Sequence, residues 1–197
     1  AAIQVDSRSR TCPRAQLDLA STIMSGAAFT IRPACAADAA AMVEIYRPHV
    51  EESWASFELV TPTAEELAAR VARAQEQHEW LVADADGELL GYAYGVRHRE
   101  RAAYRFSTEV SAYVAAGAQG RGVGAQLYQR LFDRLAARGY CNAVAGVTMP
   151  NDASVAFHER LGFTLVGVYR RVGYKFGGWR DVSWYERALR DGPPPGV

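Results

Sequence analysis

The clearest pattern in the chain is a strand, a glycine-rich turn and a helix between residues 104 and 139. Apolar and polar residues alternate from Tyr104 to Val114, and this period of two predicts a half-buried strand. After the turn, apolar residues recur every four positions, at Val123, Leu127, Leu131 and Leu135. That spacing predicts an amphipathic helix ended by Gly139. A helix that begins on a glycine turn presents unpaired N–H groups, which suit a phosphate.

The patterns on either side of this unit predict further strands and helices. Strands are expected at 29–32, 80–83, 89–96, 142–148, 163–174 and 179–189. Helices are expected from Asp38 to Pro48, from Thr63 to Gln77 and from Asn151 to Gly162. Pro48 should end the first helix, and Thr63 with Glu66 forms a capping box at the start of the second. The resulting order of elements predicts an α+β fold with a mixed central β-sheet flanked by helices.

Composition changes this picture little. The chain has 197 residues, 49% of them hydrophobic, and equal numbers of acidic and basic residues, so neither nucleic acid nor an anionic membrane is favoured as a partner. Its 3 cysteines lack metal-like spacing, which favours a reduced cytoplasmic setting. We expect residues 28–189 to form one domain. Residues 1–27, with a natural start near Met24, are expected to be a disordered or non-native extension, and residues 190–197 a flexible tail.

Three phosphate-containing cofactors use glycine turns of this kind. A Walker A loop is excluded because Ala125 and Gln126, not Lys and Ser/Thr, follow Gly124. A dinucleotide fingerprint fits the glycines, but the next predicted strand has no carboxylate for a ribose. The third pattern is Gln/Arg-x-x-Gly-x-Gly/Ala, met by Gln119, Gly122 and Gly124. It resembles the pyrophosphate loop of the GNAT acetyltransferases, although glycines that only permit a tight turn remain the alternative.

Four further motifs resemble one branch of that family, the phosphinothricin and methionine sulfone or sulfoximine N-acetyltransferases. They are Arg99-x-Arg101-x-Ala103-Tyr104, Thr108-Glu109-x-Ser111-x-Tyr113-Val114, the run from Pro150 to Phe163, and Gly173-Tyr174-Lys175-x-Gly177-x-Trp179-x-Asp181-Val182. The resemblance as a whole covers the chain from about Phe29 to Leu189. The resemblance implies a GNAT fold and transfer of acetyl from acetyl-CoA to an amine, with no metal.

The resemblance also implies catalytic roles. Glu109 falls at the position of the general base, in the middle of the predicted central strand, and a carboxylate there can accept the proton of an ammonium group. The alternative is an ion pair between Glu109 and Arg105. His158 occupies the position from which the family protonates the departing thiolate, and an imidazole can titrate near neutral pH. A packed histidine with a hydrogen bond is the alternative.

Further residues are implied to bind acetyl-CoA or the acceptor. Acetyl-CoA is expected to contact Tyr113, Val114, Ala115, Gln119, Gly120, Arg121, Gly122, Val123, Gly124, Ala125, Asn151 and Ser154. Asn151 should also cap its helix. The acceptor is expected to contact Phe57, Arg99, Arg101, Tyr104, Arg105 and Trp179, with arginine binding its anionic groups. Arg97, His98 and Arg105 differ from the sequences common in the branch, which leaves the acceptor's identity open.

The leading interpretation is therefore an enzyme that acetylates the α-amine of a small amino-acid-like molecule. The alternatives are a GNAT-shaped module that binds acyl-CoA without turnover, and an acetyltransferase of proteins or polyamines. Relatives are commonly homodimers, and Trp179, Trp184 and Tyr185 are candidates for the interface. Arg130, Arg134 and Arg138, spaced four apart, are expected to form a solvent-facing stripe.

Overall fold

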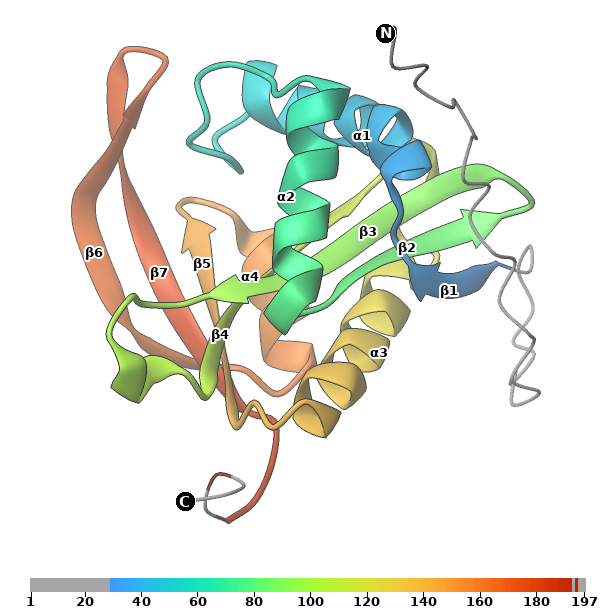
Figure 1. Cartoon of the computed structure of the whole chain (residues 1–197). Coiled ribbons are helices and arrows are strands. Elements are labelled where there is room, and N and C mark those ends of the chain that lie inside the picture. The colour runs from blue at the N-terminus through green and yellow to red at the C-terminus, as the bar shows by residue number, and fades with distance from the viewer. Residues whose placement is uncertain (1–28, 193, 195–197) are drawn as a thin grey trace, which may run out of the picture.

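A seven-stranded mixed sheet forms the centre of the computed structural model, which describes residues 29–192 and 194 (Figure 1). The strands lie in the order β1-β2-β3-β4-β5-β7-β6. Their bounds are β1 Thr30–Pro33, β2 Trp80–Ala85, β3 Glu88–Arg97, β4 Ser107–Val114, β5 Asn142–Thr148, β6 Thr164–Lys175 and β7 Gly178–Ala188. All neighbouring strands are antiparallel except β4 and β5. The predicted α+β order of elements is confirmed, whereas the expected extension at residues 1–27 lies outside the described residues.

Among the described residues, four α-helices cover the two faces of the sheet (Figure 1). They are α1 Ala39–Glu51, α2 Ala64–Gln77, α3 Val123–Ala137 and α4 Asp152–Arg160. The two-residue period of β2 divides the core, because Trp80 and Val82 pack with α1 and α2 whereas Leu81 and Ala83 pack with α3. Each face of the sheet therefore has its own apolar layer.

Strands β4 and β5 are paired over only a short distance. The register joins Ser107 with Asn142, Thr108 with Ala143, and Glu109 with Val144. Beyond these three pairs β4 runs on to Val114 and β5 to Thr148 without bonding to each other. The sheet thus splits immediately after Glu109, and it leaves one edge of β4 free for another hydrogen-bonding partner.

The predicted end of α1 is wrong, and the predicted start of α2 is confirmed. The expected end of α1 at Pro48 is wrong, because the helix continues to Glu51 and the Pro48 carbonyl accepts a hydrogen bond from Glu52 N–H at 3.0 Å. A proline near a helix end removes one donor, and the last turn still closes. The capping box is confirmed: the Thr63 hydroxyl accepts from Glu66 N–H at 3.2 Å, and the Glu66 carboxylate accepts from Thr63 N–H at 2.8 Å.

The expected solvent-facing arginine stripe is wrong at Arg134, which is half-buried, whereas Arg138 is exposed as expected although it also pairs with Glu79. Glu79, only 4% exposed, accepts from Arg134 Nε at 2.7 Å and from Arg138 Nε at 2.5 Å. A buried carboxylate needs such partners because an unpaired charge in the interior is very costly. Arg130 is exposed as expected.

The exposed apolar surface lies on the edge strand β6 rather than on the residues expected at an interface. Tyr185 is 4% exposed and stacks on His158, and Trp184 is half-buried, so of the three candidates Trp179 alone, at 48%, is largely exposed. Exposed apolar side chains on β6 are Leu165, Val166, Val168, Tyr169 and Val172. An apolar, unpaired edge of this kind is a typical pairing surface.

Candidate active site

The glycine turn forms the start of α3 as predicted. Gly120 and Gly122 have φ angles of 73° and 79°, in the left-handed region that glycine adopts without strain. Gly122 is the N-cap and has no side chain with which to cap the helix, so the first amides of α3 stay open. A Cβ at Gly124 would lie 3.4 Å from side-chain atoms of Phe157 on α4 and Val114 on β4. The anion-binding end of α3 therefore lies between the end of β4 and α4.

Helix α4 begins with the predicted cap. Asn151 Oδ1 accepts a hydrogen bond from Ser154 N–H at 3.1 Å, so the capping role of Asn151 is confirmed. Gln119 and Arg121, in the turn before α3, are both exposed. The contact between Gly124 and Phe157 thus places the start of α3 against the middle of α4.

Main-chain hydrogen bonds show which β4 amides face the split. Ala115 N–H donates to Leu90 O on the β3 side at 3.0 Å, whereas Phe106 O accepts from Cys141 N–H on the β5 side at 2.8 Å. Backbone groups of successive strand residues point to opposite edges. Even-numbered residues of β4 therefore face β5. The Val110 amide still takes part in the last ladder pair, so the amides presented to the split are those of Ala112 and Val114. Among the three predicted main-chain contacts this pattern favours Val114, because the backbones of Tyr113 and Ala115 face β3.

Glu109 is the last β4 residue paired with β5, on the face covered by α1 and α2. Its side chain is 34% exposed, and burial raises the pKa of its carboxyl while the positive charge of Arg99 opposes that rise. The alternative ion pair with Arg105 does not form. The Arg105 guanidinium instead stacks on Phe106 at 4.3 Å and donates to Ala102 O at 3.4 Å. The carboxylate approaches His98, with Nδ1 to Oε2 at 3.8 Å.

His158 lies on α4 and points into the apolar layer on the α3 face of the sheet. It is 7% exposed; its Nδ1 donates to Ser154 O at 2.8 Å, and its Nε2 lies 3.5 Å from the Tyr128 hydroxyl. Its ring contacts Phe163, with centroids 5.2 Å apart. Burial lowers the pKa of the imidazole, so the ring is neutral near pH 7. These contacts favour the alternative of a packed, hydrogen-bonded histidine over a proton donor.

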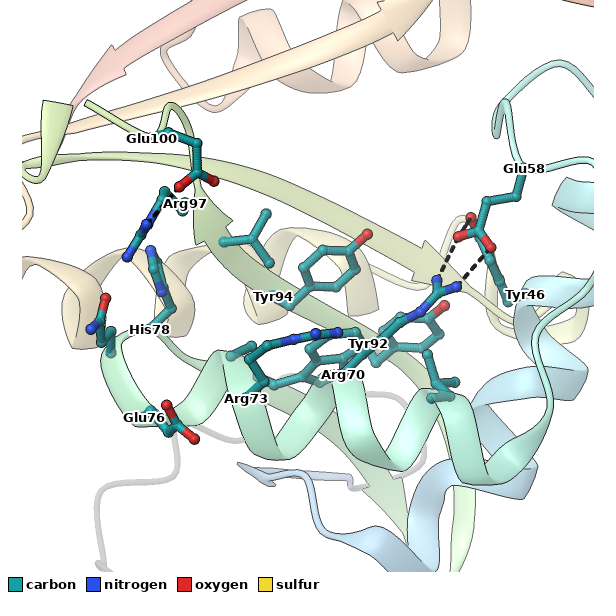
Figure 2. Close-up of a pocket in the computed structure, with 15 residues that line it drawn as sticks. Tyr46, Glu58, Arg70, Arg73, Glu76, His78, Tyr92, Tyr94, Arg97 and Glu100 are labelled. Atoms are coloured by element: carbon teal, nitrogen blue, oxygen red, sulfur yellow. Dashed lines mark hydrogen bonds and ion pairs between the residues drawn. The ribbon is translucent and has the colours of Figure 1, made fainter. Parts of the chain in front are cut away.

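A cavity of about 570 Å³ lies between α2, β3 and the loop after β3 (Figure 2). It is on the face of Glu109, since Tyr94 and Val96 line it and are the register partners of Ser111 and Glu109. Tyr94 stacks on Trp80 with ring centroids 4.1 Å apart and forms an aromatic wall. The volume and the mixture of aromatic and charged lining suit a small molecule.

Charged groups occupy both ends of the cavity (Figure 2). At one end Arg70 donates to both oxygens of Glu58, at 2.6 and 3.0 Å, and the Tyr46 hydroxyl donates to the same carboxylate at 3.0 Å. The hydrogen bond with Glu58 raises the pKa of Arg70, and Arg70 lowers the pKa of Glu58 against the opposing effect of burial, so both stay charged. At the other end lie His78 and Arg97.

The connector between α1 and α2 is fixed to the β6–β7 hairpin. The ammonium of Lys175, 3% exposed, donates to Ser53 O at 3.1 Å and to Ser56 O at 2.7 Å. Phe57 packs directly on Gly173, where a Cβ would lie 2.0 Å from its ring. Only glycine permits this approach. The hairpin and the connector are therefore joined to each other.

The predicted acceptor residues separate into two groups. Arg99, Arg101, Tyr104 and Arg105 are exposed in the loop before β4, and His98 connects that loop to Glu109. Phe57, from the connector, packs against the β6–β7 hairpin at Gly173. Trp179 packs on Tyr174 near the hairpin tip, with ring centroids 5.1 Å apart. Within the described part of the chain, no hydrogen bond, ion pair or ring contact joins Phe57 or Trp179 to the arginine loop.

Sequence analysis missed several residues of this region. The sequence shows His98 only as a difference from the sequences common in the branch. Its spacing two residues after Val96, the register partner of Glu109, puts it on the face of Glu109. Lys175 and the cavity residues Arg70 and Glu58 had no local signal. Their partners lie 119, 122 and 12 positions away in the sequence.

Comparison with known proteins decides the family. The model of the Acetyltransferase (GNAT) domain matches residues 31–184. The chain belongs to the GNAT acetyltransferase family. This GNAT protein is 39% identical over 165 residues to phosphinothricin N-acetyltransferase of Streptomyces viridochromogenes, covering 84% of this chain and 90% of that one. It is 38% identical to an L-methionine sulfoximine/L-methionine sulfone acetyltransferase of Pseudomonas aeruginosa, covering 81% and 94%.

Solved structures agree with this membership. A GNAT superfamily phosphinothricin acetyltransferase from Sinorhizobium meliloti, solved in complex with acetyl-CoA, superposes with a TM-score of 0.80. It is 35% identical, and the match covers 86% of this chain and 95% of that chain. The predicted GNAT fold is therefore confirmed.

Metal-ligand clusters and membrane-spanning helices are both absent from the described residues. No group of three or more His, Cys, Asp or Glu side chains in residues 29–192 or at 194 is placed to hold a metal ion. Across the same part of the chain, no helix is long and apolar enough to cross a membrane.

Proposed function

We propose that this GNAT protein transfers acetyl from acetyl-CoA to the α-amino group of a small amino-acid-like acceptor, of the phosphinothricin or methionine sulfone and sulfoximine type. The observation that carries the proposal is the position of Glu109, at the apex of the split between β4 and β5 and beside a cavity for an acceptor. The names of the relatives support the acceptor class.

Acetyl-CoA would lie with its pyrophosphate on the open amides between Gly120 and Ala125 at the start of α3. Arg121 and Gln119 are exposed beside that turn and would meet the phosphates. The pantetheine arm would then run along the free edge of β4, bonding to the amide of Val114, with Asn151 and Ser154 on its other side. This path brings the thioester to the apex of the split, next to Glu109.

The acetyl transfer would proceed directly, without an acetyl-enzyme. Glu109 accepts a proton from the acceptor ammonium, and the amine then attacks the thioester carbonyl. The amide of Ala112, the first beyond the last β4–β5 pair to face the split, is suited to stabilise the oxyanion. The thiolate of CoA leaves and is protonated. We assign that proton to solvent rather than to His158, since both His158 nitrogens have other partners.

The acceptor would bind on the α1–α2 face of the sheet. Its carboxylate would meet the arginine loop, through Arg99, Arg101 or Arg105 with Tyr104 beside them. Its side chain would extend over Val96 and Tyr94 into the cavity below α2. The β6–β7 hairpin, which carries Trp179, and the connector, which carries Phe57, would close the opposite side.

A thiol-release assay with acetyl-CoA tests this function. The panel comprises phosphinothricin, methionine sulfone, methionine sulfoximine, common amino acids, spermidine and a lysine-containing peptide. We expect turnover with the first three and loss of about 10²–10⁴-fold in kcat/KM in Glu109→Gln, with the acetyl-CoA Kd unchanged. Binding of acetyl-CoA without turnover of any amine would instead favour a non-catalytic acyl-CoA module. Faster turnover of spermidine or the peptide would favour a polyamine or protein acetyltransferase.

We further propose a cytoplasmic homodimer that associates through the exposed apolar edge of β6, with neither nucleic acid nor a membrane as partner. Light scattering at micromolar concentration should give twice the monomer mass. Val166, 60% exposed on that edge, offers the test, because Val166→Glu should give a monomer. A wild-type monomer would contradict the proposed assembly without affecting the proposed reaction.

A further inference from the structure

The first observation is the contact between His98 and Glu109. His98 follows directly after β3 and lies two residues beyond Val96, which is the register partner of Glu109. Side chains two residues apart share a face of the sheet, and diagonal neighbours on adjacent strands are within reach of long side chains. The imidazole Nδ1 consequently lies 3.8 Å from Oε2 of Glu109, and the two side chains are 15% and 34% exposed.

The second observation is that His98 Nδ1 is buried and has no hydrogen-bond partner among the described residues. Leaving a buried nitrogen unpaired is unfavourable, because its hydrogen bond to water is lost and not replaced. The His98 ring is held between Tyr104 and Trp184, with ring centroids 6.2 and 6.3 Å away. The indole N–H of Trp184 is also buried without a partner in the described chain. The ring is thus fixed in place with one nitrogen directed only toward the carboxylate.

The third observation concerns the charges around the pair. The positive charge of Arg99 acts to lower the pKa of both His98 and Glu109. Arg97 is paired with Glu100 at 2.9 Å. The phenols near the pair are those of Tyr94, on β3, and Tyr104, in the loop. Trp184, from β7, carries no charge. Burial raises the pKa of Glu109 and lowers that of His98, so the two proton affinities are brought closer together.

We propose that His98 is a second proton-accepting residue of the acetyl transfer, which receives from Glu109 the proton that Glu109 removes from the acceptor ammonium. The proposal rests on the role of Glu109 in the proposed function. The ammonium N–H bond breaks and its proton passes to a carboxylate oxygen of Glu109. That proton then moves to His98 Nδ1, and the imidazolium releases its Nε2 proton to water. The freed amine attacks the thioester carbonyl, and the C–S bond breaks with its electron pair on the CoA sulfur, which takes a proton from solvent.

The distance of 3.8 Å is longer than a direct hydrogen bond. Catalytic hydrogen bonds are often long in the free enzyme and shorten when substrate excludes water. The advantage of the second step follows from reference pKa values of about 4.3 for Glu and about 6.5 for His. A proton on imidazole is therefore favoured by about two pKa units over one on the carboxylate, and burial narrows this difference. The expected contribution to kcat/KM is about 10- to 100-fold.

Kinetics of four proteins test the proposal: wild type, His98→Gln, Glu109→Gln and the double variant. With methionine sulfone as acceptor, kcat/KM is measured from pH 5.5 to 9. In the wild type, kcat/KM should fall at acid pH as the pair of His98 and Glu109 takes up a proton, and the pKa of the imidazole should set the pH of that fall. His98→Gln should lower kcat/KM at pH 7 by about 10- to 100-fold and move this acid limb to lower pH, where Glu109 alone titrates. The double variant should be no slower than Glu109→Gln, because the two residues act in series.

A titration that needs no turnover provides the second test. Imidazole NMR should show the pKa of His98 falling by about one unit in Glu109→Gln, because the carboxylate stabilises the imidazolium. His49→Gln is the matched control: His49 is another half-buried histidine, and it packs on Tyr113 rather than on a carboxylate. It should leave the acid limb in place.

Three results separate the possible failures. If His98→Gln lowers kcat/KM equally at every pH, or if the pKa of His98 is the same in Glu109→Gln, His98 has only a structural role and the proposal is overturned. Full activity of a folded Glu109→Gln protein would instead remove the base of the proposed function. Thermal melting and acetyl-CoA calorimetry check each variant, and His98→Asn, which is smaller, replaces His98→Gln if the latter does not fold.

Discussion

The ammonium of Lys175 is expected to hold the acceptor side of the site together, and Lys175→Met tests this. Methionine keeps the length and apolar character of the side chain but cannot donate hydrogen bonds. It would leave the carbonyls of Ser53 and Ser56 without the donor that now lies 3.1 and 2.7 Å away. The connector would then lose its hydrogen bonds to β6 and keep the packing of Phe57 on Gly173.

The structure sets the size of the effect. Each buried carbonyl left without a donor costs about 1–3 kcal/mol. The sum of the costs for the two carbonyls is reduced, because the variant no longer has to remove an ammonium group from water on folding, and that group is only 3% exposed in the wild type. We therefore expect Lys175→Met to lower the free energy of unfolding by about 2–4 kcal/mol. For a chain of this size that corresponds to a fall in Tm of roughly 5–15 °C.

Thermal melting and steady-state kinetics measure the two consequences. The KM for the acceptor should rise several-fold, because the connector forms one wall of its proposed site, whereas the Kd of acetyl-CoA should not change. Arg130→Met is the control for loss of a positive charge, since Arg130 is exposed on α3, and its Tm should stay within about 2 °C of wild type. A Tm and an acceptor KM both equal to wild type in Lys175→Met would show that the connector is held without the ammonium.

Two more predictions follow from the same structure. Gly122→Ala places a residue with a Cβ at a φ of 79°, and it should raise the Kd of acetyl-CoA at least about tenfold in calorimetry. Gly167→Ala is the control, because Gly167 is half-buried with open space around it, and it should leave that Kd unchanged. Burial, together with Arg97 and Arg138, lowers the pKa of His78 to about 4, so its protonation favours the unfolded state. Stability from this group is complete above about pH 6.5 and decreases by about 3 kcal/mol as the pH falls to 4. His78→Gln should flatten that part of a pH–melting curve, and an unchanged acid limb would contradict the assignment.

Local patterns in the sequence determined most of the secondary structure. The period of two in β4, the four-residue spacing of leucines in α3, and the caps at Thr63 and Asn151 each depend on residues within a few positions of one another. Such features are visible without the fold, because backbone geometry alone sets which neighbours share a face. The motifs for acetyl-CoA could be predicted for the same reason, since turn and helix start are contiguous.

Only the tertiary structure decided which charged and polar groups meet. Arg134 and Arg138 were expected to face solvent, yet they pair with Glu79, 55 and 59 positions away. Lys175 reaches a connector more than 100 positions earlier, and His98 meets Glu109 because β3 and β4 pair in one particular register. Burial then changes the proton affinities of these groups, and burial depends on how the helices pack on the sheet. The local sequence specifies a carboxylate on a strand, whereas strand register and helix packing place it at the apex of the split, beside an imidazole.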